Sequence, residues 1–268
     1  MGDRRKNSGF RGTILKQIND MKLKDKVAII TGSSKGIGAG IAKEYAREGA
    51  RVVINYASSK ESADRVVEEI TQMGGSAIAI QADISKVADI KRLFTETDKA
   101  YGRLDILVNN ASVWRYEMLE EISEETFQLQ ITTGLMAQMF CAKEAIARFG
   151  ENGGSIINLS STISLNPIPG TLIYCAVKAG IDSLAKTLAK ELGPRNIRVN
   201  TIAPGMTESE GSTADGRPGS AMEKYYLDQT PLGRIGLPID IAKVAVFLAS
   251  EDAGWVTGER ITVAGGLL

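Results

Sequence analysis

The stretch "KVAIITGSSKGIG", residues 26–38, decides the fold. An apolar, β-branched run ends at Thr31 and continues directly into a loop with glycines at positions 32, 36 and 38. Glycine lets the backbone turn tightly and approach a phosphate group, whose charge then lies at the amino terminus of the next helix. We therefore predict a strand, a phosphate-binding loop and a helix that opens at about Ile37. The residues of this candidate loop are Gly32, Ser34, Lys35, Gly36, Ile37 and Gly38.

Short apolar runs recur along the rest of the chain and alternate with amphipathic segments. A near-continuous apolar run is typical of a strand that is buried on both faces of a parallel sheet. The seven runs are residues 26–31, 51–55, 76–81, 104–109, 154–160, 197–203 and 260–264. Strands that alternate with helices in this way predict a single α/β domain, with a doubly wound, seven-stranded parallel sheet and helices on both faces.

The segments between these runs have the spacing of helices. In residues 85–101, Ser85 is a candidate N-cap and apolar residues recur on one helical face. Residues 123–149 and 171–192 show the same pattern. We predict a helix in each of the three segments.

Two segments depart from this alternation. Residues 1–22 are basic and polar, which predicts a flexible extension before a domain at 23–268. Residues 205–220 are polar and rich in glycine, and a short helical stretch follows near 221–228. Functional insertions in such sheets follow the carboxyl ends of strands, which favours a substrate lid at about 206–228; a solvated surface loop is the alternative.

Composition narrows the class of partner. The 268 residues are 43% hydrophobic and 24% charged, which is enough to bury one full core. The 32 basic and 32 acidic residues cancel, so the net charge favours neither nucleic acid nor an anionic membrane surface. We expect a small-molecule partner.

The two cysteines, Cys141 and Cys175, both lie in segments with helical spacing. They are interpreted as ordinary packing residues rather than as a disulfide or metal pair, and no metal site is expected. The sequence shows neither a secretory signal pattern nor an apolar run long enough to span a bilayer, so we expect a cytoplasmic protein.

The end of the second apolar run bears on the choice of cofactor. A site for NAD usually has an acidic residue there that binds the ribose hydroxyls, and "NYASSK", residues 55–60, contains none. Lys35 instead offers an ammonium to a 2′-phosphate, with Tyr56, Ser58 and Ser59 as hydroxyl donors. This pattern favours NADPH over NADH. Lys35 taken alone would be interpreted as a solvated loop lysine.

The stretch "YCAVK", residues 174–178, is the candidate catalytic element of a chain that contains no histidine. Tyr174 and Lys178 are four residues apart, so they share one helical face. An adjacent ammonium favours a phenolate, so this tyrosine can do acid–base work. Ser161, just after the fifth run, is suited to hydrogen-bond a substrate oxygen. The absence of histidine excludes a Ser-His-Asp hydrolase.

Together these motifs resemble the short-chain dehydrogenase/reductase family, from about Asp25 to Gly266. The matching features are "TGSSKGIG", Asp83 after the third run, "NNAS" at 109–112, Ser161, "YCAVK" and "PG" at 204–205. The resemblance implies a Rossmann-type fold, hydride transfer between nicotinamide and a carbonyl or alcohol, and a homotetramer or homodimer. The motifs are similar to those of 3-oxoacyl-carrier-protein reductases, polyhydroxynaphthalene-type reductases and glucose dehydrogenases, so they do not choose the substrate.

The resemblance also implies roles for single residues. Tyr174 would be the general acid or base, Lys178 would support it and hold the nicotinamide ribose, and Ser161 would orient the carbonyl. The further cofactor contacts expected are Asp83, Ile84, Asn110, Ala111, Pro204, Gly205 and Thr207. The substrate pocket would include Trp114, Ser164, Leu165 and Ile168.

Three positions depart from the family pattern. Ser112 replaces a glycine, and Ala264 replaces an aspartate. Gly134 stands 24 residues after Asn110, where many members carry an asparagine that helps to hold a water between the catalytic lysine and solvent. Two interpretations compete: the relay runs through the Gly134 carbonyl and an extra water, or proton resupply is impaired. The leading functional hypothesis is an NADPH-dependent carbonyl reductase, and the alternative is a catalytically impaired dinucleotide-binding sensor or scaffold.

Overall fold

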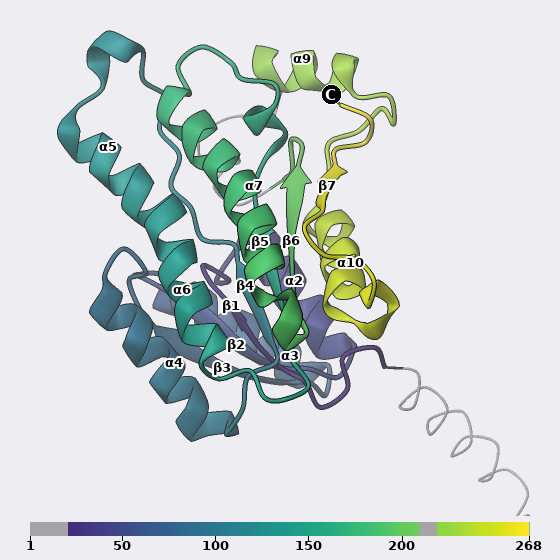
Figure 1. The fold of residues 1–268 in the computed structure, drawn as a ribbon. Coiled ribbons are helices and arrows are strands. Elements are labelled where there is room, and N and C mark those ends of the chain that lie inside the picture. Colours follow the sequence, from purple (N-terminus) through teal and green to yellow (C-terminus); the bar gives the residue numbers. More distant parts are fainter. Residues whose placement is uncertain (1–20, 209–218, 268) are drawn as a thin grey trace, which may run out of the picture.

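Seven parallel strands form one sheet in the computed structural model, which describes residues 21–208 and 219–267 (Figure 1). The strands are β1 (Val27–Ile30), β2 (Arg51–Tyr56), β3 (Ser76–Gln81), β4 (Ile106–Asn109), β5 (Gly154–Leu159), β6 (Ile197–Pro204) and β7 (Arg260–Val263). Their order is β3-β2-β1-β4-β5-β6-β7, so the chain changes direction across the sheet between β1 and β4. Ligands of such sheets bind at the carboxyl ends of the strands beside this reversal. The predicted doubly wound sheet is confirmed.

Helices cover both faces of the sheet (Figure 1). One layer consists of α2 (Gly36–Arg47), α3 (Lys60–Gln72) and α10 (Pro238–Ala249); the other consists of α4 (Val87–Tyr101), α5 (Glu124–Ile131), α6 (Ala137–Ile146) and α7 (Leu172–Leu192). Neighbouring strand residues face opposite layers, as the period of a strand requires. Ile30 and Ile54 lie in the core beneath the first layer, whereas Ile29 and Val53 lie beneath the second.

Two of the predicted helices differ in detail from the sequence expectation. The N-cap of α4 is Lys86, and the hydroxyl of Ser85 donates to Asp83 at 2.7 Å instead of capping the helix. The single helix predicted over 123–149 consists of α5 and α6 separated by a π turn at Thr132–Met136. Single π turns inside helices are frequent at functional sites. The predicted helix at 171–192 is confirmed by α7.

The two segments outside the alternation are only partly described. Residues 1–20 of the predicted extension and 209–218 of the predicted lid lie outside the described residues. Lys22 contacts the folded body, because its Nζ lies 2.5 Å from a carboxylate oxygen of Asp252. The helical stretch expected near 221–228 is confirmed by α9 (Ala221–Gln229), which lies at the carboxyl edge of the sheet (Figure 1). In the described part of the chain, every helix is too short or too polar to cross a bilayer.

Candidate active site

The phosphate loop lies between the end of β1 and the start of α2, which begins at Gly36. Gly32 has a φ of +60°, and a Cβ there would lie 2.8 Å from the Cβ of Ala111. A Cβ at Gly38 would lie 2.6 Å from Nδ2 of Asn110. Among the described residues no side chain caps α2 and no acidic residue lies in its first turn, so the positive end of this helix favours an anion. These features fit the pyrophosphate of a dinucleotide.

Two asparagines hold the phosphate loop in place. Nδ2 of Asn110 donates to the carbonyl oxygens of Thr31 at 2.9 Å and Gly32 at 3.0 Å. The backbone amides of Asn110 and Ala111 both donate to Oγ1 of Thr31, at 3.0 and 3.1 Å. Oδ1 of Asn55 accepts from the amide of Gly32 at 3.1 Å. Asn110 and Ala111 therefore both contact the phosphate loop, and Asn110 shapes it through the loop backbone.

The residues expected at the ribose differ in the solvent exposure of their side chains. Ser34 and Tyr56 are nearly buried, each 9% exposed, and Tyr56 packs in the apolar core beneath the first helical layer. Lys35 and Ser58 are exposed. Ser59 is the N-cap of α3, yet its hydroxyl makes no capping hydrogen bond. The hydroxyl and the positive end of α3 are thus both available to an anion.

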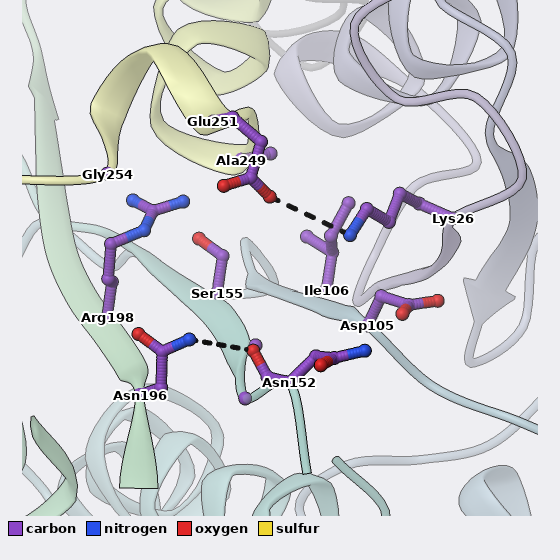
Figure 2. Close-up of a pocket in the computed structure, with 12 residues that line it drawn as sticks. Lys26, Asp105, Ile106, Asn152, Ser155, Asn196, Arg198, Ala249, Glu251 and Gly254 are labelled. Atoms are coloured by element: carbon purple, nitrogen blue, oxygen red, sulfur yellow. Dashed lines mark hydrogen bonds and ion pairs between the residues drawn. The ribbon is translucent and has the colours of Figure 1, made fainter. Parts of the chain in front are cut away.

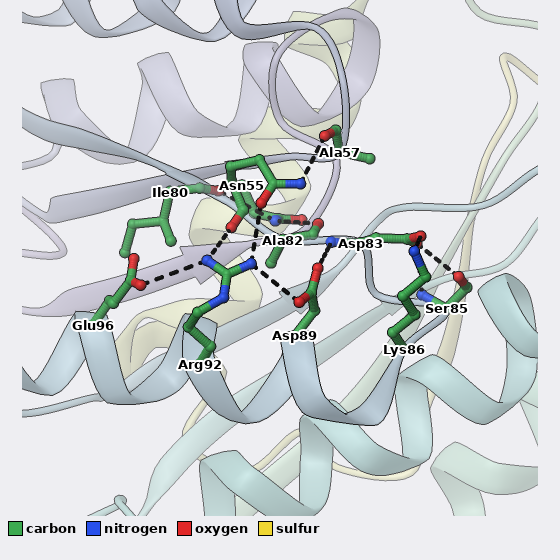
Figure 3. A network of polar contacts seen from close by, with 11 residues as sticks. Asn55, Ala57, Ile80, Ala82, Asp83, Ser85, Lys86, Asp89, Arg92 and Glu96 are labelled. Atoms are coloured by element: carbon green, nitrogen blue, oxygen red, sulfur yellow. Dashed lines mark hydrogen bonds and ion pairs between the residues drawn. The ribbon is translucent and has the colours of Figure 1, made fainter.

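A polar network follows the end of β3 at the expected adenine position (Figure 3). The carboxylate of Asp83 accepts from Ser85 at 2.7 Å and lies 3.1 Å from Nζ of Lys86. Burial alone would raise the pKa of Asp83, but the hydrogen bonds from Ser85 and the ammonium of Lys86 lower it below its usual value. The amide of Asp83 donates to Asp89 at 2.8 Å, and neighbouring Ile84 is buried. The position of Asp83 is therefore fixed by the protein itself.

Tyr174 and Lys178 lie on α7 as predicted. Lys178 is only 2% exposed, and its Nζ donates to the carbonyl oxygen of Leu159 at 2.8 Å. The same Nζ lies 5.2 Å from the centre of the Tyr174 ring. Burial lowers the pKa of Lys178 from 10.5 to about 8, and the carboxylate of Asp182 opposes this shift. An ammonium with this pKa is mostly charged at pH 7, beside the tyrosine that it is expected to support.

Ser161 lies at the end of β5, on the same edge of the sheet. It is the N-cap of a short 3-10 turn at Thr162–Ser164, and its Oγ accepts from the amide of Ile163 at 3.3 Å. The preceding Ser160 donates from its Oγ to the carbonyl oxygen of Lys178 at 3.2 Å. The end of β5 is therefore joined directly to the helix that carries the tyrosine and lysine.

The segments after β6 and β7 pack against each other at the expected nicotinamide end. A Cβ at Gly205, which follows Pro204, would lie 2.7 Å from the Cβ of Ala264. The amide of Gly205 donates to Val263 at 3.0 Å, and the hydroxyl of Thr207 donates to the carbonyl oxygen of Gly205 at 3.1 Å. The departure at position 264 is thus a small side chain that covers a glycine.

Ser112, the second departure, leaves a polar group unsatisfied. Its Oγ is buried and has no hydrogen-bond partner among the residues that the structure describes. A buried hydroxyl costs free energy unless a partner satisfies it. The end of β4 thus presents a hydroxyl that a bound molecule or a water would satisfy.

Gly134, the third departure, lies in the π turn and packs against α7, the helix of Tyr174 and Lys178. A Cβ at Gly134 would lie 2.5 Å from Cγ1 of Val177, which is 1% exposed. Val177 is the residue before Lys178 in "YCAVK". The valine therefore fills the space into which a side chain at position 134 would extend.

Comparisons with known proteins give the family of this chain. A family model described as enoyl-(acyl carrier protein) reductase matches residues 32–268. An uncharacterized oxidoreductase of Methylorubrum extorquens is 47% identical over 246 residues, which cover 92% of this chain and 99% of that protein. A hydroxynaphthalene reductase-like protein of Metarhizium majus is 39% identical over 255 residues, 91% of this chain and 95% of that protein.

A solved structure matches the same share of the chain. The short chain dehydrogenase of Burkholderia cenocepacia in complex with NADP is 33% identical, with a TM-score of 0.86. The match covers 92% of this chain and 99% of that one. This chain belongs to the short-chain dehydrogenase/reductase family. As a member, it is a dehydrogenase or reductase that uses a nicotinamide dinucleotide.

This short-chain dehydrogenase/reductase also has a polar cavity of about 110 Å³ at the opposite edge of its sheet (Figure 2). Nη2 of Arg198 donates there to the carbonyl oxygen of Ser250 at 3.1 Å, and Nδ2 of Asn196 donates to the carbonyl oxygen of Asn152 at 2.9 Å. The cavity lies at the amino ends of β4, β5 and β6. It is therefore separate from the predicted cofactor and catalytic residues, which follow the carboxyl ends.

The sequence did not predict two residues that lie beside Ser161. Asp182 and Arg260 form an ion pair of 3.0 Å next to Ser161. Asp182 repeats the four-residue spacing of Tyr174 and Lys178 along α7, and that spacing is the only signal the sequence offers. Arg260 lies on β7, far along the chain, and no local pattern connects it to the site.

Proposed function

We propose that the protein is an NADPH-dependent carbonyl reductase that converts a ketone to a secondary alcohol, with Tyr174 as the proton donor. The observation that carries this proposal is the buried ammonium of Lys178, 5.2 Å from the centre of the Tyr174 ring. When bound, the reduced nicotinamide supplies the hydride. The same residues would serve the reverse reaction, with Tyr174 accepting the proton.

The protein residues contribute orientation and proton transfer. The hydroxyl of Ser161 donates to the substrate oxygen and orients it toward the hydroxyl of Tyr174, which releases its proton as negative charge develops on that oxygen. The ammonium of Lys178 stabilises the phenolate that remains. Because Lys178 is fixed by its hydrogen bond to Leu159, its charge stays beside Tyr174 throughout the cycle.

Replacement of the tyrosine tests this proposal. We expect Tyr174→Phe to abolish substrate-dependent NADPH oxidation and to leave the NADPH dissociation constant within about threefold of wild type, because Phe keeps the ring but has no proton to donate. Stopped-flow oxidation assays and NADPH fluorescence titration measure the two quantities. Normal turnover by Tyr174→Phe would contradict the proposal.

The preference for NADPH rests on the end of β2 and the start of α3. The stretch 55–60, where an acidic residue would select NAD, has none, and its first residue, Asn55, uses its carboxamide to hold Gly32 and the backbone of Ala82. The free hydroxyl of Ser59, the exposed Ser58 and the exposed Lys35 offer donors and positive charge to a 2′-phosphate. The NADP bound to the Burkholderia relative supports the same preference.

The substrate that fits best is a large, apolar ketone. Large hydrophobic side chains are exposed on the loops after β4 and β5 and on α9, all at the carboxyl edge: Tyr116, Met118, Leu119, Leu165 and Tyr225. Exposed apolar surface beside a catalytic group is typical of a binding mouth for an apolar ligand. The hydroxynaphthalene reductase-like relative suggests a fused aromatic ketone.

A panel of carbonyl compounds tests the substrate and the cofactor together. The panel contains fused aromatic ketones, 3-oxoacyl thioesters and aldoses, each assayed with NADPH and with NADH. We expect the highest kcat/KM for the aromatic ketones with NADPH. A higher value for the thioesters or aldoses would overturn the substrate assignment and leave the reductase assignment intact.

A dinucleotide-binding sensor without efficient catalysis is the second candidate, because Gly134 lacks the side chain that many members use to hold a relay water. It would be favoured by tight NADPH binding together with no reduction of any compound in the panel. Since Val177 occupies the space beside Gly134, Gly134→Asn alone is not a suitable rescue experiment for this candidate.

We further propose that the protein forms a homodimer or homotetramer through the edge of the sheet at β7. Within residues 21–208 and 219–267, β7 has a neighbouring strand on one side only, and the side chain of Trp255, five residues before it, is fully exposed. A large exposed aromatic beside a free strand edge is typical of an interface. Light scattering should give a multiple of the 28.7 kDa chain mass, and Trp255→Ser should lower it. A monomeric wild-type protein would refute this assembly.

A further inference from the structure

One side chain from β7 joins the loop of the catalytic serine to the helix of the catalytic tyrosine. Nη2 of Arg260 donates to the carbonyl oxygen of Ser161 at 3.0 Å and to Oγ of Ser164 at 3.1 Å. Nε of the same guanidinium donates to Oδ2 of Asp182, on α7, at 3.0 Å. The guanidinium therefore contacts both elements that carry the proposed catalytic residues.

Asp182 completes the connection from the side of the helix. It lies four residues after Lys178 and eight after Tyr174, so the three side chains share one face of α7. Its Oδ2 also lies 2.6 Å from Oγ of Ser164. Arg260, Asp182 and Ser164 thus form a closed polar cluster around the turn that Ser161 begins.

The ion pair in this cluster is shielded from water. The side chains of Asp182 and Arg260 are 12% and 14% exposed. Loss of either partner would leave a largely buried charge without its counter-ion, so the pair holds a defined geometry far more firmly than a surface ion pair does. The charged or titratable groups that face Lys178 are Tyr174 and Asp182 of its own helix, and Arg260 binds Asp182 from β7.

We propose that Arg260 and Asp182 are positioning residues, which fix the hydroxyl of Ser161 relative to Tyr174 and Lys178 so that both hydroxyls reach one substrate oxygen. The inference rests on the proposed reductase function. Neither residue needs to touch the substrate: Arg260 acts through the carbonyl of Ser161, and Asp182 acts through Arg260 and α7. Small displacements of groups that hold a reacting atom lower the rate strongly.

Arg260→Met, with Arg148→Met as its matched control, tests the proposal. Arg148 also forms ion pairs between elements, 2.8 Å from Asp98 on α4 and 2.8 Å from Glu144 on α6, and its side chain is 19% exposed, but it lies outside the site. We expect both variants to melt at a lower temperature. Only Arg260→Met should lower kcat, by about 10-fold to 100-fold, with the KM for NADPH within about threefold. Equal effects of the two variants on kcat would overturn the proposal.

A double variant shows whether Arg260 acts through the serine. In the Ser161→Ala background, Arg260→Met should lower kcat by less than about threefold, because the hydroxyl that the arginine positions is already absent. If the fold-decrease in kcat of the double variant equals the product of the two single fold-decreases, Arg260 does not act through Ser161. Arg260→Lys should recover part of kcat, since an ammonium keeps the charge but not the fork of donors.

Asp182→Asn provides a readout that a purely structural role would not change. Removal of the carboxylate removes the group that raises the pKa of Lys178, so the alkaline limb of the kcat/KM profile should move to lower pH. Arg148→Met should leave the limb in place. An unmoved limb in Asp182→Asn would remove Asp182 from the proposal.

Crystal structures of wild type, Arg260→Met and Arg148→Met test the positioning without turnover. We expect the turn at 161–164 to shift relative to α7 in Arg260→Met alone. An unshifted turn would overturn the proposal even if the enzyme is active. A wild-type protein that reduces no ketone but shows the expected shift would refute the reductase function and leave the positioning role standing.

Discussion

The phosphate loop and the π turn each contain a glycine in a crowded position, but the crowding has different origins. A Cβ at Gly38 would lie 2.6 Å from Nδ2 of Asn110, a side chain after β4 that holds the loop, and 2.7 Å from the backbone oxygen of Gly32 in the loop itself. A Cβ at Gly134 would lie 2.5 Å from Cγ1 of Val177, the end of a side chain on another helix. The first glycine allows the backbone to approach a ligand, whereas the second allows a neighbouring side chain to fill the space.

A departure from the family pattern therefore has to be interpreted together with the residues that contact it. A residue at position 134 cannot be judged alone, because its partner at position 177 has a size that matches the glycine. The missing asparagine is therefore part of a two-residue arrangement rather than a simple deletion of function. By contrast, the glycine at position 38 also meets the backbone of its own loop, at Gly32, so the loop motif explains part of its crowding without the contact to Asn110.

The largest effect is expected in the loop. Gly38→Ala should raise the dissociation constant for NADPH by about 100-fold, because the added methyl meets backbone and a held carboxamide that cannot move without opening the loop. Fluorescence titration with NADPH measures the change. Gly150→Ala is the control, since a Cβ there meets nothing within 4 Å. An unchanged dissociation constant for Gly38→Ala would show that the loop does not require a glycine at position 38.

Gly134→Asn should lower the free energy of unfolding by about 1–3 kcal/mol and should not raise kcat, because the new side chain meets Val177. The double variant with Val177→Ala should regain most of that stability. Urea denaturation measures both. Gly180→Ala is the helical control, since its Cβ would lie 3.4 Å from Leu135, an ordinary contact. A stable Gly134→Asn protein with higher kcat would show that Val177 does not exclude the asparagine.

Lys35→Ala should raise the KM for NADPH about 10-fold and the KM for NADH little, because only NADPH has the 2′-phosphate that the ammonium would meet. Parallel initial-rate measurements with both cofactors test this. Lys86→Ala, which removes the partner of Asp83 at the adenine end, should affect both cofactors alike. Equal effects of Lys35→Ala on the two cofactors would mean that the 2′-phosphate binds elsewhere.

The smallest effect near neutral pH is expected from the titration of Lys178. Ketone reduction should fall as pH rises through about 8, where the buried ammonium loses its proton and no longer stabilises the phenolate. The pKa of this lysine is lowered from 10.5 on folding, so the unfolded chain binds more protons between pH 8 and 10.5. Below pH 8 the buried ammonium therefore lowers the free energy of unfolding. This destabilisation decreases as pH rises from 8 to 10.5.

A kcat profile over pH 6–10 and denaturation at the same pH values measure the two trends. Lys178→Met should remove the pH dependence of unfolding that this group causes, although it also abolishes turnover. A wild-type rate that stays constant to pH 10 would contradict the role assigned to the ammonium.

Local patterns were sufficient for most of the fold. The seven apolar runs agree with the seven strands to within about two residues, because buried parallel strands require continuous apolar sequence. The helix at 171–192 follows in the same way from its periodic apolar face. The π turn was not predicted, since the apolar spacing of the segment 123–149 indicates one continuous helix.

In the candidate site, too, some features follow from local sequence patterns and others only from the folded chain. The sequence was enough to locate the candidate phosphate loop, the pair Tyr174 and Lys178, and Ser161, because each is recognised by residue types at short, fixed spacings. Only the tertiary structure decided the burial that lowers the pKa of Lys178, the contact of Val177 with Gly134, and the ion pair of Asp182 with Arg260. These depend on residues far apart in the chain, whose contacts exist only once the strands and helices have packed.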